Sequence, residues 1–292
     1  MSGPPRKIFL RCLLACLLLA VGACSNLQIG YNLGDTATLY YLDGYLDLNA
    51  RQEQQVSAEL KQLFAWHREN ELPAYARELG KIRQMLEKPL SIAQLQDTND
   101  FMRDALQRLA LKSVPMLSQL MLSLTPQQVA YLREQLDESN ALWREEQLAG
   151  SPAEQRDQRY ERMLEQFEQW LGPLDAQQQA TLRVSNEQWP VDQQFWYSER
   201  LIRQQEMLAL IEYSVTQQPP QAQLELRLRG YILNFEKDRS VQRKVRVDSS
   251  REHVMRLIVG LTNNATAVQK QHIVLRAQDL IDDFSALVAA GD

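Results

Sequence analysis

Cysteine and histidine are scarce in this chain of 292 residues, which contains three of each. The cysteines are Cys12, Cys16 and Cys24, and the histidines are His67, His253 and His272. We expect cleavage before Cys24, so the mature chain would hold no thiol pair, which excludes a disulfide and a cysteine-ligated metal. The histidines also lack a metal-binding spacing such as HExxH. The sequence therefore predicts no metal site and no cofactor.

Motifs typical of several enzyme classes are missing as well. The chain has no glycine-rich phosphate loop and no G-x-S-x-G nucleophile turn. Acidic residues are so evenly spread that no pair of carboxylates stands out as a general acid and base. We predict a protein that is not an enzyme. A peptidoglycan-cleaving lytic enzyme is the alternative among enzymes.

The charge balance is acidic, with a formal net charge of −5. Removal of residues 1–23, which contain three basic residues and no acid, would take this charge to −8. Nucleic-acid binding needs a clustered basic face, so we predict no nucleic-acid partner.

The first 24 residues have the layout of an export signal. Arg6 and Lys7 precede the apolar run Ile8–Ala20, and the small residues Gly22 and Ala23 precede Cys24. Arg11 interrupts the run, which falls short of the roughly 20 apolar residues of a membrane-spanning helix. We therefore predict cleavage between Ala23 and Cys24.

This segment resembles the lipobox of bacterial lipoproteins, in which the cysteine is acylated and becomes the first residue. The resemblance implies a membrane partner that is contacted through acyl chains on Cys24. Two or three such chains make a stable anchor. Ser25 stands where aspartate would favour retention at the inner membrane, so the resemblance implies an outer-membrane protein that faces the periplasm.

The rest of the chain has the composition of a helical protein. Glycine, at 11 of 292 residues, is below the usual ~7%, and no run alternates as a strand would. We predict an all-α fold, an irregular bundle of long, kinked antiparallel helices. The expected parts are a signal (1–23), an anchored lead-in (24–47), a helical bundle (48–216) and C-terminal helices packed on the same bundle (217–292).

A short phrase recurs and predicts where helices begin. It consists of Leu, a capping residue, two spacers and Gln, an arrangement typical of a capping box with a hydrophobic staple. The cap and Gln positions are Asn49 and Gln52, Ser91 and Gln94, Thr125 and Gln128, and Asp175 and Gln178. Similar starts are expected at Ser151, Ser249 and Thr262.

Prolines predict where helices break. Pro73 is expected to kink or split a helix, and Pro115 to end or bend the next one. A long helix over 175–213 is expected to bend at Pro190. Residues 217–220 look like a linker, and further helices are expected over 221–246 and 263–287.

Two aromatic clusters each allow two interpretations. Trp189, Phe195, Trp196 and Tyr197 lie beside the bend expected at Pro190, and they either fill the core or line a groove for an apolar peptide or lipid. The lead-in is rich in Tyr and Leu over 27–46. It either packs on the bundle or rests on a membrane, which Asp35, Asp43 and Asp47 would oppose.

An ordered set of motifs resembles a family of proteobacterial lipoproteins of unknown function. The motifs of this set are IGYN at 29–32, LDL with Gln52 at 46–52, WHR with ELP at 66–73, and WLG with Leu174 and Gln178 at 170–178. The similarity runs to about Arg203 and implies a lipidated helical protein with no assigned activity.

The segment 124–128, LTPQQ, also resembles the LTxxQ phrase of Spy and CpxP type periplasmic chaperones. The other three phrases replace Thr by Asn, Ser or Asp. Together these features predict a non-enzymatic envelope lipoprotein that binds a protein or peptide, as a chaperone or a scaffold. A lipid-binding protein is a further alternative.

Overall fold

The computed structural model describes residues 26–189, 192–235 and 240–291, and within them the only regular elements are helices. The predicted all-α fold is confirmed. Ala23 and Cys24 lie outside the described residues. The helices are α2 (Asn26–Asn32), α3 (Gly34–Leu46), α4 (Ala50–Asn70), α5 (Leu72–Met85), α6 (Ile92–Ser123), α7 (Pro126–Leu148), α8 (Pro152–Leu171), α9 (Ala176–Gln188), α10 (Gln193–Gln217), α11 (Gln221–Asn234), α12 (Val241–Asn263) and α13 (Ala267–Ala289).

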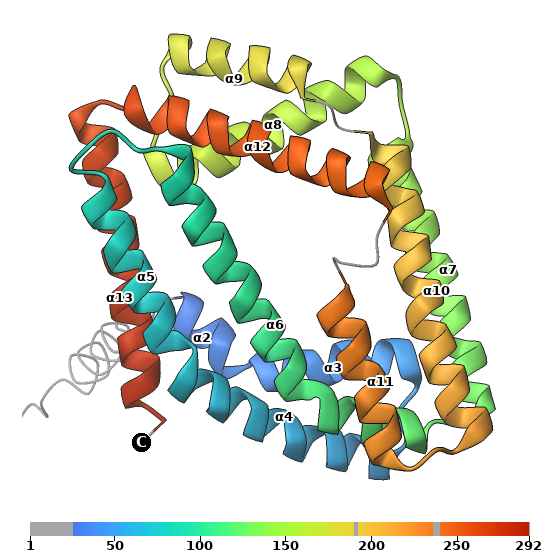
Figure 1. Ribbon diagram of the computed structural model, residues 1–292. Coiled ribbons are helices and arrows are strands. Elements are labelled where there is room, and N and C mark those ends of the chain that lie inside the picture. The colour runs from blue at the N-terminus through green and yellow to red at the C-terminus, as the bar shows by residue number, and fades with distance from the viewer. Residues whose placement is uncertain (1–25, 190–191, 236–239, 292) are drawn as a thin grey trace, which may run out of the picture.

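The helices form a frame around a central opening (Figure 1). Helices α5 and α13 make one side, α7 and α10 the opposite side, and α6 runs diagonally between the two ends. Neighbouring helices are antiparallel, as predicted. For example, Arg83 of α5 hydrogen-bonds Gln278 of α13, whereas Tyr75 contacts Phe284 further along the pair.

Two hydrophobic cores stabilise opposite ends of this frame. The first joins α3, α4, α7, α10 and α11 with the end of α6, and includes the fully buried Leu60 and Leu224. The second joins α8, α9, α12 and α13 around the fully buried Leu182. The C-terminal helices are therefore divided, because α11 packs in the first core whereas α12 and α13 build the second.

Prolines break the helices at two of the three expected places. The chain turns at Glu71, so α5 starts with Pro73 in its first turn, where proline is tolerated. Helix α9 ends at Gln188 and α10 begins at Gln193, on either side of Pro190, which is outside the described residues. Pro115 does not end its helix, because α6 continues to Ser123.

All four predicted capping phrases form complete capping boxes. The side chains of Asn49, Ser91, Thr125 and Asp175 accept from the backbone N–H three residues on, and each Gln reaches back to the N–H of its cap. Ser151 caps α8 in the same way with Glu154. The expected helix starts are confirmed at these five positions.

Two other expected starts are wrong. Ser249 lies inside α12, and Thr262 lies near the end of that helix. The start of the last helix is Thr266, whose box with Gln269 was missed because Ala265 stands where the phrase has Leu. The cap and Gln positions therefore indicate where a helix begins, and the leading Leu is not required.

The boxes also join helices to each other through their glutamines. Gln52 and Gln128 are buried, and each amide donates to the other's oxygen, at 3.3 and 2.8 Å. Gln178 and Gln269 repeat the arrangement in the second core, at 2.8 and 2.9 Å. Each core therefore contains two helix N-termini that are held together by a reciprocal pair of amides.

Candidate functional site

An apolar pocket of about 460 Å³ lies where α5, α8 and α12 meet the turn before α6. This volume falls within the ~300–1,000 Å³ that is usual for ligand pockets. Its wall includes Ile82 and Met85 of α5, Phe167 and Trp170 of α8, and Leu257 and Ile258 of α12. The pocket thus presents side chains from segments that are far apart in sequence.

Asn263, the last residue of α12, fixes one wall of the pocket. Its side-chain oxygen accepts the backbone N–H of Leu90 at 2.7 Å, and its amide donates to the Leu90 carbonyl at 3.0 Å. Leu90 lines the pocket and directly precedes the Ser91 cap of α6. This clamp therefore couples the end of α12 to the start of α6.

Trp189 forms another part of the wall. Its indole Nε1 donates to Ser250 Oγ at 3.0 Å, and its ring stacks on His253 with 5.6 Å between centroids. Both partners belong to α12, so the indole is held in one orientation beside the pocket. The expected role of Trp189 in an apolar groove is consistent with this position.

The other three residues of the predicted aromatic groove lie elsewhere. Phe195 contacts Trp196 and has the Arg246 guanidinium 4.8 Å from its ring centroid. Tyr197 stacks on Trp143 of α7, with 5.4 Å between centroids. These side chains do not line the pocket that contains Trp189.

A serine and a histidine meet near Trp189, but their geometry does not make a nucleophile and base. His253 Nε2 lies 2.9 Å from Ser185 Oγ and also 2.9 Å from the Ser185 carbonyl oxygen. In the tautomer that carries the proton on Nε2, this nitrogen donates to the carbonyl oxygen and cannot take the proton of the serine hydroxyl.

A second polar cluster joins α2, α4 and α5. His67 Nδ1 lies 2.9 Å from the Tyr31 hydroxyl, and His67 Nε2 lies 3.3 Å from the Tyr75 hydroxyl. Burial lowers the pKa of His67 and raises the pKa of both tyrosines. The histidine is thus a neutral link between helices at pH 7.

The buried carboxylate of Glu71 completes this cluster. Arg108 of α6 binds it through two hydrogen bonds, of 2.9 and 2.8 Å. These bonds hold the pKa of Glu71 below its usual range. A charged, fully paired carboxylate is a structural joint and not a proton donor at neutral pH.

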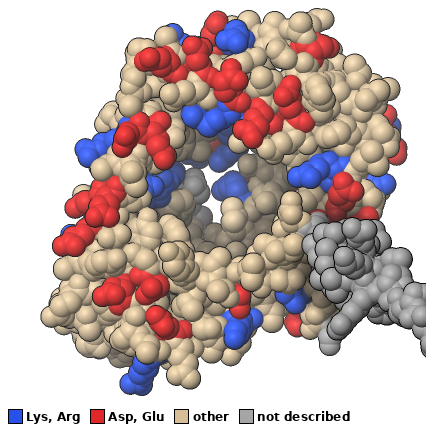
Figure 2. Space-filling view, turned by 180° about the vertical axis from the view of Figure 1, so that it is seen from behind, with Lys and Arg blue, Asp and Glu red and all other residues tan. Residues whose placement is uncertain are grey.

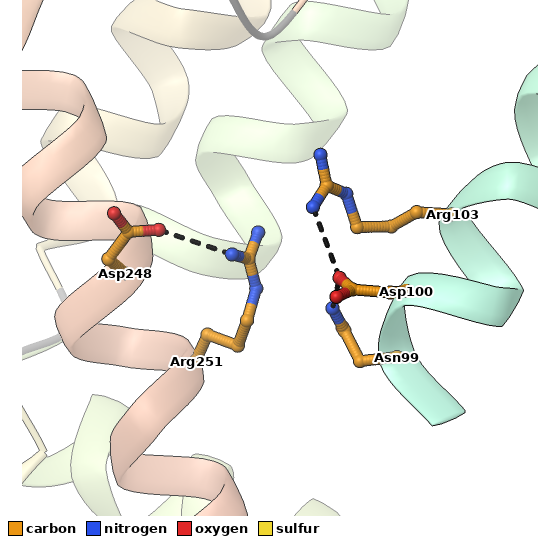
Figure 3. Close-up of polar contacts among 5 residues, drawn as sticks. All are labelled: Asn99, Asp100, Arg103, Asp248 and Arg251. Carbon is orange, nitrogen blue, oxygen red and sulfur yellow. Dashed lines mark hydrogen bonds and ion pairs between the residues drawn. The ribbon is translucent and has the colours of Figure 1, made fainter. Parts of the chain in front are cut away.

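The central opening has charged walls. Figure 2 shows Lys and Arg side chains around it. On one side Arg251 pairs with Asp248 of α12 at 3.1 Å, and on the other Arg103 pairs with Asp100 of α6 at 3.4 Å (Figure 3). Each arginine shown is compensated by an acid of its own helix, so these pairs do not form a free anion site.

Apart from Trp189, no residue pattern in the sequence predicts this pocket. The rest of the pocket wall depends on how α5, α8 and α12 pack, and the spacing of residues within one helix does not determine that packing. Within the described residues, no group of three or more metal-ligating side chains occurs, and no helix is long and apolar enough to cross a membrane.

Comparison with known proteins gives a family and no assigned activity. No curated protein and no solved structure matches the chain. One family pattern matches residues 44–234, which cover α4 to α11 and the end of α3. The chain belongs to this family, DUF6279, a family of unknown function.

Proposed function

We propose that this protein is a non-enzymatic envelope lipoprotein that is anchored through Cys24 and binds an apolar segment of a protein or peptide. The observation that carries the proposal is the apolar pocket between α5, α8 and α12. The lipobox-like segment supports the anchor, and outer-membrane attachment follows from Ser25 by resemblance.

The chemistry of the pocket favours a peptide over a hydrocarbon chain. Apolar side chains gain roughly 25 cal/mol per Å² when they leave water, so the apolar wall favours either ligand. A peptide also carries backbone N–H and C=O groups that need partners. Gln166 and Gln169 stand at the wall, and in the described part of the chain their amides make no hydrogen bond to another residue. These amides can both donate to a peptide backbone and accept from it.

The described contacts also agree with a role that is not catalytic. In each of the two polar clusters that contain a histidine, the ring has hydrogen-bond partners within the protein. His67 contacts Tyr31 and Tyr75, and His253 contacts Ser185. Neither cluster leaves a poised base beside a nucleophile. A chaperone-like or scaffolding role therefore fits the site better than wall cleavage.

Peptide binding to residues 25–292 tests the proposal. The probe is a set of short unstructured peptides, apolar or polar, each carrying a fluorescent label, and the signal is the fluorescence anisotropy of the label. Ile258→Glu puts a charge in the pocket, whereas Val245→Glu makes the same change at an exposed site of α12. We expect only Ile258→Glu to weaken binding of apolar peptides. Equal binding by both variants would refute the pocket, and displacement by fatty acid alone would reassign it to lipid.

A further inference from the structure

Helices α2 and α3 expose a surface without charge. From Ile29 to Gly44, every exposed position is occupied by an uncharged residue, whereas 24% of the whole chain is charged. The largest of these side chains are Ile29, Leu33, Tyr40 and Tyr41, which are 47%, 58%, 80% and 64% exposed. Ile29 and Leu33 lie one helical turn apart at the end of α2, Tyr40 lies in α3, and the adjacent Tyr41 turns towards Tyr45, with 5.0 Å between ring centroids.

The opposite side of α3 is also apolar, and it is already covered. Leu39, Leu42 and Tyr45 pack against the first core, and Leu46 is buried in it. The exposed side, here named the outer face of α2–α3, therefore lacks a cover within the described chain.

The acids of this segment do not occupy the outer face. Asp35 accepts the N–H of Thr36 at the first turn of α3, at 2.7 Å. Asp43 accepts the N–H of Leu48 at 2.9 Å. Both half-buried carboxylates are thus held by backbone groups at the two ends of α3, and the exposed Asp47 follows the end of that helix, outside residues 29–44.

We propose that the outer face of α2–α3 rests on the surface of the lipid bilayer. The inference rests on the proposed anchor at Cys24, which precedes the first residue of α2 by two positions. Two residues span at most about 7 Å, so an acylated Cys24 would hold α2 next to the lipid headgroups. Tyrosine with aliphatic residues is the composition that favours this interface.

Contacts between α2 and helices α4 and α13 would fix the orientation of the whole frame relative to the bilayer. Gln28 binds Asp283 of α13 at 2.8 Å, Asn32 binds Arg68 of α4 at 3.1 Å, and Tyr31 contacts His67. Helices α8 and α12, which form much of the apolar pocket, lie at the other end of the frame (Figure 1).

Site-specific fluorescence in vesicles tests this contact. The full acylated chain is reconstituted in phosphatidylethanolamine and phosphatidylglycerol vesicles, with a single environment-sensitive label at Tyr40→Cys. Val268→Cys, at a 79% exposed site in the first turn of α13, is the matched control. The signal is quenching by nitroxide-labelled lipid, after mass spectrometry has shown the acyl groups on Cys24.

We expect lipid nitroxides to remove most of the emission at position 40 and to leave position 268 unchanged. An acylated protein whose label at 40 is not quenched overturns the bilayer contact alone. The bilayer contact is also overturned if the emission of the label changes only at high protein concentration, because that result indicates that a second copy of the chain covers this surface. A chain that carries no acyl mass overturns the anchor and the contact together.

Discussion

Single glutamines determine how helix starts are joined in this protein. The side-chain oxygen of each N3 Gln accepts the backbone N–H of its own cap. In the two buried pairs, the side-chain nitrogen also donates to the glutamine of a neighbouring helix. Gln128 also donates to the carbonyls of Leu46 and Asp47, at 3.0 and 2.9 Å. A buried amide that loses such partners costs about 1–3 kcal/mol, so the glutamine pair is a sensitive point of the fold.

The substitution Gln128→Leu is therefore expected to cost more than Gln94→Leu. Both remove a capping box, worth about 1 kcal/mol, but only Gln128 has a partner glutamine on another helix. We expect Gln128→Leu to lower the free energy of unfolding by about 2–4 kcal/mol, because the carbonyls of Leu46 and Asp47 lose the amide that donates to them and Gln52 loses one of its partners. Urea unfolding followed by circular dichroism measures both. Equal losses would mean that the pair adds nothing to the caps.

His67 gives stability a defined pH dependence. Burial lowers its pKa, so below the ordinary value of 6.5 the unfolded chain binds a proton that the folded chain does not. The free energy of unfolding is thus expected to fall as the pH drops from about 6.5 towards the lowered folded pKa. His67→Gln should flatten this step in urea unfolding between pH 7.5 and 5.5. An unchanged profile in the variant would show that another group causes the dependence.

At the scale of elements, helix starts were predictable because the residues of a capping box lie within four consecutive positions of the sequence. Ser249 failed as a start because a polar pair inside α12 looks like a cap, and the start at Thr266 was missed because the pattern required a leading Leu. Pro115 does not end α6, which continues past it, and the bend expected there stays a prediction. The errors at Ser249 and Thr266 both concern which residues of the local pattern mark a helix start.

The clamp between Asn263 and Leu90 was not predictable, because its partners are 173 residues apart. Asn263→Ala should remove both of its bonds and lower the free energy of unfolding by about 1–3 kcal/mol. Asn264→Ala is the control, since the exposed amide of Asn264 binds only within its own helix, to the Gly260 carbonyl. Hydrogen exchange at residues 90–94 reports on the joint directly. Exchange that is equally slow in both variants would contradict a clamp at this position.

At the scale of the whole molecule, the sequence predicts helices and their antiparallel order but not their arrangement as a frame. Amphipathic spacing shows that a helix has an apolar side, and it does not show which partner covers that side. The division into two cores separates α11 from α12 and α13, although these helices follow each other in sequence. The apolar pocket and the uncovered outer face of α2–α3 both result from this arrangement.

Photo-crosslinking in intact bacteria shows whether the apolar pocket holds part of another polypeptide. A photoreactive residue replaces Ile258 in the pocket or, as the control, the exposed Val245 of the same helix. Mass spectrometry then identifies the adducts on the full anchored chain. We expect peptide adducts from envelope proteins at position 258 and none at position 245. Adducts at neither position, equal adducts at both, or lipid adducts alone would contradict this expectation.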